Sequence, residues 1–411
     1  MRRSTRCTLK EMNSRVQKNN QYMPADVNKV SDILMVSDSC FVLDDFEVLP
    51  QTPFEDLASR FLNKDDYNLG KLLGAGGFGS VYLASYKNKI TAVKTLHKVT
   101  KNPKAQMESY KAELNVYNWK HPNIVRTVAA TSIEQYDTGA WIVMEYIGLR
   151  NLQMIINDTE EELDQQRRLK YSLEVASALE FTHSNHIVHL DLKPANILLT
   201  ERDSCKLGDF GCCQRVEEDT GRVSPTNRSA LTGTFAYRAP ELLRGGAPTL
   251  VADVYSFGVT LWQLLSRDTP YSNQNQHVVI FSVVSKNLRP PHPDIGDDPF
   301  ELLYQELYTQ CWSAKPETRP TSCELVELLK MWKYYIVIYF FHGFYCVFAN
   351  MDFLIYCIYF FCQKISICKT ILYNIINVLV KRFPSRIGYL DNLLYPLIDH
   401  DECFRIKCTV Y

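Results

Sequence analysis

The stretch that most constrains the fold of this chain runs from residue 188 to 199 and reads VHLDLKPANILL. Asp191 and Asn196 stand in it at the spacing D-x-x-x-x-N, and Lys193 lies two residues after the aspartate. At this spacing the aspartate orients a hydroxyl and accepts its proton, whereas the asparagine holds a magnesium ion. A lysine between them stabilises the charge that develops on a transferred phosphate. The stretch therefore predicts a loop that transfers a phosphoryl group to a hydroxyl.

A glycine-rich turn predicts where the phosphate donor binds. Residues 67–86 read as two short strands joined by a turn, in which Gly74, Gly76, Gly79 and Val81 form the pattern G-x-G-x-x-G-x-V. Glycines let the backbone lie close over the phosphates of ATP without a Cβ in the way. Taken alone, the pattern also fits a flexible loop or a dinucleotide-binding turn.

The next strand strengthens the interpretation of the glycine turn. It contains Lys94, which is expected to pair with the α- and β-phosphates. A lone lysine among apolar neighbours would be costly to bury, so it needs a partner. Glu113 follows nineteen residues later, in the expected helix over residues 108–120. We therefore predict an ion pair between Lys94 and Glu113.

A hinge is expected after the apolar strand 141–144. Met144 would lie behind the adenine ring, and Ile147 would bind adenine through its backbone. Glu145 stands between them at the start of the hinge. The same residues would also belong to the core of a sheet, and the two interpretations are compatible.

A second magnesium ligand is predicted at Asp209, in the segment KLGDFG. Magnesium keeps a nearly octahedral shell with several waters, so two protein oxygens suffice. Phe210 is expected to stack between His189 and Tyr117. Residues Val81, Ala92 and Leu198 are expected to enclose adenine, by their offsets from the motifs. The residues predicted to bind ATP are Leu73, Gly74, Ala75, Gly76, Gly77, Phe78, Gly79, Ser80, Val81, Ala92, Lys94, Glu113, Met144, Glu145, Ile147 and Leu198.

The segment that follows Asp209 is rich in hydroxyl groups. We expect the hydroxyl of Thr234 to tie Lys193 to Asp191, which gives it a catalytic role. The other hydroxyls could carry phosphates but are more often solvated loop residues. They belong to Thr220, Ser224, Thr226, Ser229 and Thr232.

Two polar contacts are expected to support the site from the interior. Glu241 should bind Arg319, and Asp253 should anchor the catalytic loop from a hydrophobic helix.

Residues 67–332 together resemble the protein kinases, and finer features narrow the resemblance to the Mos proto-oncogene serine/threonine kinases. The finer features are the leucine in His-Leu-Asp and the cysteine after Asp-Phe-Gly, beside the segments GAGGFGSV, YRAPELL and DVYSFGVTLWQ. The resemblance implies an α+β, bilobal fold. Residues 67–146 would form an N-lobe of antiparallel strands with one key helix, and residues 148–332 a mainly helical C-lobe.

The resemblance also implies a function. The chain is expected to be a monomeric serine/threonine kinase that uses ATP and Mg²⁺. It would act as a MAP kinase kinase kinase in oocyte meiosis and phosphorylate MAP kinase kinases. The alternative is a pseudokinase scaffold that binds a nucleotide or a partner without turnover. Every catalytic position holds a chemically competent residue, which favours the enzyme.

Leu190 departs from the usual His-Arg-Asp pattern. The missing arginine would bind a phosphate on the activation segment, and a leucine cannot do so. We therefore predict activity that does not depend on such a phosphate. The alternative is that another basic residue, such as Arg238, takes over the role.

The remaining sequence flanks the kinase-like region. Residues 1–66 are polar and expected to be partly disordered: the first thirty hold seven Lys/Arg and two acids, while 31–66 hold two and nine. This asymmetry could also guide a partner. The net charge of −1 gives no reason to expect nucleic-acid binding. The start MRRSTRCTLKEMNSR has no apolar core, and the thirteen cysteines show no C-x-x-C pair, so we expect a cytoplasmic protein with reduced thiols.

Residues 333–411 form an apolar extension rich in Tyr, Phe, Ile and Cys, after a last helix expected to close at Met331. Between residues 334 and 362 the one charged residue is Asp352. This length could span a bilayer, although an acid near its centre costs about 2.5–3.5 kcal/mol. Three alternatives stay open: translated non-coding sequence, an apolar appendage that is buried or interfacial, and a transmembrane helix. Membrane association is expected only if the segment inserts.

Overall fold

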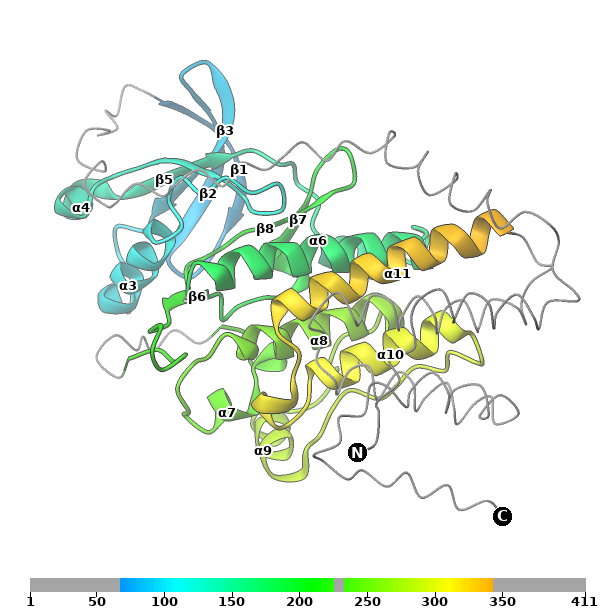
Figure 1. The fold of residues 1–411 in the computed structure, drawn as a ribbon. Coiled ribbons are helices and arrows are strands. Elements are labelled where there is room, and N and C mark those ends of the chain that lie inside the picture. Colours follow the sequence, from blue (N-terminus) through cyan, green and yellow to red (C-terminus); the bar gives the residue numbers. More distant parts are fainter. Residues whose placement is uncertain (1–66, 225–232, 343–411) are drawn as a thin grey trace, which may run out of the picture. The chain divides into compact units, whose positions relative to one another are not determined.

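The computed structural model describes residues 67–224 and 233–342 (Figure 1). They form an antiparallel five-stranded sheet with helix α3 beside it, followed by a mainly helical region with short strands. The predicted α+β, bilobal fold is therefore confirmed. The predicted leader and most of the predicted extension lie outside the described residues.

The N-lobe sheet has the strand order β1-β2-β3-β5-β4. The predicted pair of strands around the glycine turn is present, and so is the predicted strand before the hinge. In the register of β2 and β3, Val81 faces Lys94, and in that of β3 and β5, Ala92 faces Met144. The strands are β1 Tyr67–Ala75, β2 Gly79–Tyr86, β3 Lys89–Leu96, β4 Thr127–Ala130 and β5 Trp141–Glu145.

Helix α3, Pro103–Leu114, is the helix that carries Glu113. The side chain of Asn102 accepts a hydrogen bond from the amide of Ala105, and Pro103 occupies the first turn, where its missing N–H costs nothing. The helix thus begins earlier than residue 108 and ends before residue 120, so the predicted bounds were wrong. Four turn residues follow Leu114, and Asn118 has a φ of +62°, which no helix tolerates.

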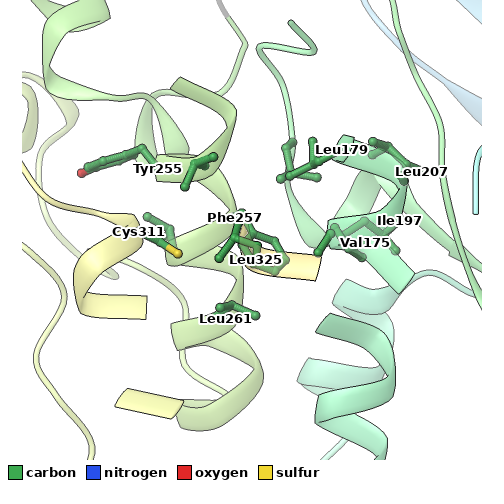
Figure 2. Close-up of a cluster of buried hydrophobic side chains, with 14 of the residues drawn as sticks. Val175, Leu179, Ile197, Leu207, Tyr255, Phe257, Leu261, Cys311 and Leu325 are labelled. Carbon is green, nitrogen blue, oxygen red and sulfur yellow. The ribbon is translucent and has the colours of Figure 1, made fainter. Parts of the chain in front are cut away.

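The C-lobe is organised around α8, Val251–Ser266, whose residues are buried on all sides from Ala252 to Leu264. Figure 2 shows Phe257 of α8 in one cluster of buried side chains with Val175 of α6 and Leu325 of α11. A helix that is buried on every side lies in the interior of a domain. The other helices are α4 Tyr136–Gly139, α5 Leu152–Asn157, α6 Gln165–Ser184, α7 Pro240–Leu243, α9 Gln276–Lys286, α10 Pro299–Cys311 and α11 Ser322–His342.

Short elements connect these helices and carry the catalytic loop. Strand β6 pairs with β9 and β7 pairs with β8, both antiparallel. The catalytic loop lies between β6 and β7, and the segment after β8 carries Asp209. The short strands are β6 Ile187–Val188, β7 Ile197–Leu199, β8 Cys205–Leu207 and β9 Gln214–Arg215, and the 3-10 turns are η3 Ile133–Gln135, η4 Pro194–Asn196, η5 Phe235–Tyr237 and η6 Pro316–Thr318.

Helix α11 continues to His342, eleven residues beyond the predicted end at Met331. No glycine or proline interrupts the sequence before Gly343, so no local signal ends the helix earlier. Its start is a capping box, in which the amide of Glu324 donates to the hydroxyl of Thr321 and the amide of Thr321 donates to the carboxylate of Glu324. Among the described residues, no helix combines the length and hydropathy that crossing a membrane requires. The predicted candidate span 334–362 lies mostly outside them.

Candidate active site

The predicted ion pair between β3 and α3 is present. Lys94 Nζ contacts Glu113 Oε1 and lies 3.4 Å from Asp209 Oδ1. The side chains of Lys94 and Glu113 are 16% and 7% exposed. Burial alone would lower the pKa of Lys94, but the two carboxylates outweigh it and raise that pKa above its ordinary value. The lysine is therefore charged and placed to face an anion.

Asp209 and Asn196 supply the oxygens expected at a magnesium site. The Asp209 side chain is 52% exposed, and the charge of Lys94 lowers the pKa of its carboxyl group. Asn196 Nδ2 donates to the main-chain oxygen of Asp191 at 2.8 Å and to its Oδ2 at 3.0 Å. Both contacts use the amide nitrogen of Asn196. Its amide oxygen, the atom that magnesium prefers as a ligand, therefore takes no part in them.

The catalytic-loop residues and Thr234 form one hydrogen-bonded group. Lys193 Nζ lies 2.7 Å from both Asp191 Oδ2 and the hydroxyl oxygen of Thr234. The Thr234 hydroxyl and amide donate to Asp191 Oδ1 at 2.9 and 2.8 Å. The predicted link through Thr234 is confirmed. Both oxygens of the Asp191 carboxylate are thereby fixed in orientation.

Asp253 of α8 anchors the catalytic loop, as predicted. Asp253, which is fully buried, accepts the amide of His189 at 2.7 Å and that of Leu190 at 2.8 Å. Its Oδ2 also lies 3.0 Å from Nε2 of His183. Leu190 has a φ of +65°, a conformation that costs a branched side chain energy, and the two anchored amides hold it there. Its side chain is 6% exposed and belongs to the C-lobe core.

Phe210 contacts His189, as predicted, but edge-on and not stacked: the ring centroids are 4.7 Å apart and the ring planes meet at 65°. Its other ring contact is Trp119, at 6.0 Å, in the place where Tyr117 was expected. Tyr117 instead packs against the N-lobe cluster around Tyr110 and Leu114. The prediction for Tyr117 was wrong because the helix ends at Leu114, so that a helical offset from Glu113 does not place residue 117.

His189 has a defined tautomer in this network. Its Nδ1 accepts the amide of Asp191 at 3.2 Å, and its Nε2 lies 3.1 Å from the carbonyl oxygen of Gly208. A ring nitrogen that faces a carbonyl must carry the proton, so Nε2 is the donor. His189 thereby links the catalytic loop to the segment that carries Asp209.

The glycine turn is closed by a bond from the amide of Gly76 to the carbonyl of Gly79, at 2.8 Å. A Cβ on Gly79 would lie 2.4 Å from the carbonyl oxygen of Thr95, so a side chain there would separate β2 from β3. A Cβ on Gly74 or Gly77 would meet nothing within 4 Å. Of the predicted residues, Leu73, Gly74 and Ala75 lie on β1, Gly76, Gly77 and Phe78 in the turn, and Gly79, Ser80 and Val81 on β2.

The predicted adenine contacts come from both sides of the hinge. Ala92 and Met144 are cross-strand neighbours on β3 and β5, and Leu198 lies on β7. Ile147 lies in the hinge, two residues after the end of β5. The side chain of Glu145 is used elsewhere: its Oε1 accepts the amide of Arg126 and the ammonium of Lys206, each at 2.8 Å. The predicted contact of Glu145 with ATP would therefore be made by its backbone.

Side-chain contacts hold both ends of the activation segment. Glu241 and Arg319 form the predicted pair, a two-bonded contact at 2.7 and 2.8 Å. At the other end, Cys213 Sγ donates to the carbonyl of Ala112 on α3 at 3.2 Å, a contact that sequence reasoning missed. No sequence pattern reveals it, because a thiol is a weak donor and every residue offers a carbonyl.

Arg238 was the alternative phosphate reader. Its guanidinium donates to the carbonyl of Gly233 at 2.6 Å, and burial lowers its pKa. Of the candidate phosphate acceptors, Thr220 is exposed and bonds to Glu217, whereas Thr226, Ser229 and Thr232 lie outside the described residues. Activity that does not depend on a phosphate in the activation segment thus stays a prediction.

All five cysteines in the described part of the chain are free thiols, in line with the expectation of reduced cysteines. They are Cys205, Cys212, Cys213, Cys311 and Cys323.

Comparison with known proteins shows which family this chain resembles. Residues 67–330 match the protein kinase domain. The "Serine/threonine-protein kinase mos" of Patiria pectinifera is 49% identical over 266 residues, which cover 64% of this chain and 75% of the relative. The protein of the same name from Xenopus laevis is 41% identical, covering 63% and 74%. The "Proto-oncogene serine/threonine-protein kinase mos" of Sus scrofa is 43% identical, covering 61% and 76%.

These matches agree with the geometry around Asp191 and Lys94. A protein kinase domain uses ATP and Mg²⁺ in general, and relatives of this similarity are serine/threonine kinases. The chain therefore belongs to the protein kinase family and, within it, to the Mos serine/threonine kinases.

Proposed function

We propose that this kinase acts as a MAP kinase kinase kinase, which transfers the γ-phosphate of ATP to serine or threonine residues of MAP kinase kinases during oocyte meiosis. The observation that carries the proposal is the complete hydrogen-bonded group of Asp191, Lys193 and Thr234, with Lys94 and Glu113 paired at the same time. The substrate class and the meiotic role rest on the resemblance to Mos kinases.

The residues present fit ATP and magnesium. Lys94 is a largely buried cation, and the glycine turn has open space at the Cβ positions of Gly74 and Gly77. Asp209 and Asn196 would hold magnesium, a hard cation that prefers oxygen ligands. When bound, magnesium would neutralise charge on the phosphates.

Three side chains of this protein then perform the steps of phosphate transfer. Asp191 orients the acceptor hydroxyl and accepts its proton as the new oxygen–phosphorus bond forms and ADP leaves. Lys193 stabilises the charge on the transferred group, and Thr234 holds Lys193 and Asp191 in register. A pseudokinase would lack one of these groups, and none is missing.

The test is phosphate transfer from ATP to a purified MAP kinase kinase. The wild-type chain should phosphorylate it on serine or threonine. Asp191→Asn keeps the size of the side chain but cannot accept a proton, so the rate should fall by about 10²–10⁴-fold. Equal incorporation by both proteins would refute the assignment of Asp191. Transfer to generic substrates but not to any MAP kinase kinase would refute the substrate class.

A cytoplasmic location is part of the proposal. It is supported by the five free cysteines among the described residues, since disulfides form mainly in oxidising compartments. Fractionation of oocytes checks it, and recovery of the protein with secreted or lumenal fractions would contradict it.

A further inference from the structure

Gln106 is a buried polar residue of α3 that the catalytic roles above do not use. It is 5% exposed, and both its side-chain nitrogen and its side-chain oxygen form hydrogen bonds. Its Nε2 donates to the carbonyl of Phe78 at 2.7 Å and to that of His97 at 3.0 Å. Its Oε1 accepts the hydroxyl of Tyr136 at 3.2 Å. The side chain is therefore fixed in one orientation, with both donors directed at main-chain carbonyls.

One of those carbonyls belongs to the glycine turn. Phe78 lies between Gly76 and Gly79, which close the turn with their own hydrogen bond. The carbonyl of Phe78 accepts a second bond, from the amide of His97, at 3.0 Å. Two donors from outside the turn thus hold it. A turn held in this way presents its amides in one place, which favours binding of phosphates.

Gln106 shares a helix face with Glu113. The two residues are seven positions apart on α3, which is two helical turns, so they lie on the same side. Glu113 holds Lys94, and Gln106 holds the turn. One face of α3 therefore contacts both elements that are expected to bind the phosphates.

We propose that Gln106 is a positioning residue for the phosphates of ATP. It acts through the carbonyl of Phe78 and couples the placement of α3 to that of the glycine turn. The proposal rests on the proposed use of ATP by this site. Its consequence is selective: removing the donor should weaken ligands that carry phosphates and leave adenosine binding unchanged.

The central variant is Gln106→Glu in the full chain. Glutamate has the same shape and keeps an acceptor for Tyr136, but an ionised carboxylate cannot donate to Phe78 or His97. Affinities for Mg²⁺–ATP and for adenosine are measured by calorimetry. Loss of one or two hydrogen bonds predicts about 5- to 20-fold weaker ATP binding and a change below about twofold for adenosine. The KM for ATP should rise by a similar factor, with a smaller change in kcat.

Two further variants control for folding. Tyr136→Phe removes the third bond of Gln106 but leaves both donors, so ATP affinity should stay within about twofold of wild type. Gln106→Met keeps the length and apolar packing of the side chain, and it should show the same ATP-selective loss as Gln106→Glu. Thermal unfolding of each variant shows that it is folded.

The outcomes separate this proposal from the proposed function. Wild-type binding of ATP, with an equal loss of ATP and adenosine affinity in the Gln106 variants or with no loss in either, overturns the positioning role and leaves the kinase assignment intact. Failure of the wild-type chain to bind ATP overturns both. An ATP-selective loss in both Gln106 variants supports the proposal.

Discussion

The C-lobe and the N-lobe hold their catalytic groups in different ways. In the C-lobe, the loop with Asp191 rests on one large apolar cluster and is anchored by Asp253, which is fully buried. In the N-lobe the apolar residues divide into smaller clusters, and the nearer partner of Lys94, Glu113, comes from a single helix, α3. The proton acceptor is thus built into the core, whereas the phosphate-binding elements depend on a few polar contacts.

This difference separates stability from activity. A change under the catalytic loop should cost folding free energy first, because it leaves buried amides without partners. A change in the polar contacts of α3 should cost activity first, because Lys94 keeps a second carboxylate, Asp209, 3.4 Å away when Glu113 is changed.

The largest effect is expected at the anchor of the C-lobe. Asp253→Ala leaves the amides of His189 and Leu190 unsatisfied in the interior. The free energy of unfolding should fall by about 3–5 kcal/mol, measured by urea denaturation. A matched change, Asp298→Ala, removes a surface cap whose carboxylate accepts the amide of Glu301, and it should cost about 1 kcal/mol. Equal losses for the two variants would contradict the account of the C-lobe.

A smaller effect, on activity and not on stability, is expected in the N-lobe. Glu113→Gln removes the charge that pairs with Lys94. The value of kcat/KM should fall by about 10- to 100-fold, as expected for one charge-assisted hydrogen bond, while the free energy of unfolding changes by less than about 1 kcal/mol. The exposed Lys111 on the same helix offers a control, and Lys111→Gln should leave both quantities unchanged. A loss of stability without a loss of activity in Glu113→Gln would reverse the comparison.

The connection between α3 and β4 predicts how acid acts on the fold. Burial, together with the charge of Lys206, lowers the pKa of His121 to about 4. The unfolded chain binds this proton near pH 6.5, so the stabilising contribution is complete above that pH and is lost as the pH falls towards about 4. From pH 7 to pH 5, His121 should account for a loss of about 2 kcal/mol in the free energy of unfolding.

Urea denaturation at the two pH values measures this contribution. His121→Gln cannot titrate, so its stability should fall less steeply than that of wild type. His277→Gln, at an exposed histidine of α9, should keep the wild-type slope. An unchanged slope in His121→Gln would show that this histidine is not the acid-sensitive group.

Contacts between two distinctive side chains could be predicted from the sequence. Lys94 with Glu113 and Glu241 with Arg319 pair charges that burial would otherwise make costly, so the spacing of the motifs was enough. Thr234 and Asp253 were placed by their sequence motifs, and the partners of Asp253 are main-chain amides. These contacts lie in the catalytic machinery, where the chemistry restricts which residue types can serve.

Contacts that depend on backbone geometry could not be predicted. Gln106 and Cys213 bind main-chain carbonyls, which every residue offers, so no pattern marks the partner. Trp119, and not Tyr117, contacts Phe210 because α3 ends before the expected residue. Helix ends are decided by caps and by tertiary packing, which a hydrophobic pattern does not report.

The smallest effect is expected in the activation segment. Leu190 is buried in the C-lobe core, and the contacts of Glu241 with Arg319 and of Cys213 with Ala112 hold the two ends of the segment. Phosphorylation should therefore add little to an arrangement that is already assembled.

The most direct test replaces every candidate phosphate acceptor of the segment at once. In the full chain, Thr220, Ser224, Thr226, Ser229 and Thr232 are changed together to Ala, and phosphate transfer to a MAP kinase kinase is measured. The account predicts activity within about threefold of wild type, as expected for changes away from the core. Near-total loss of activity, with the protein still folded, would show that a phosphate is required and that a group such as Arg238 reads it.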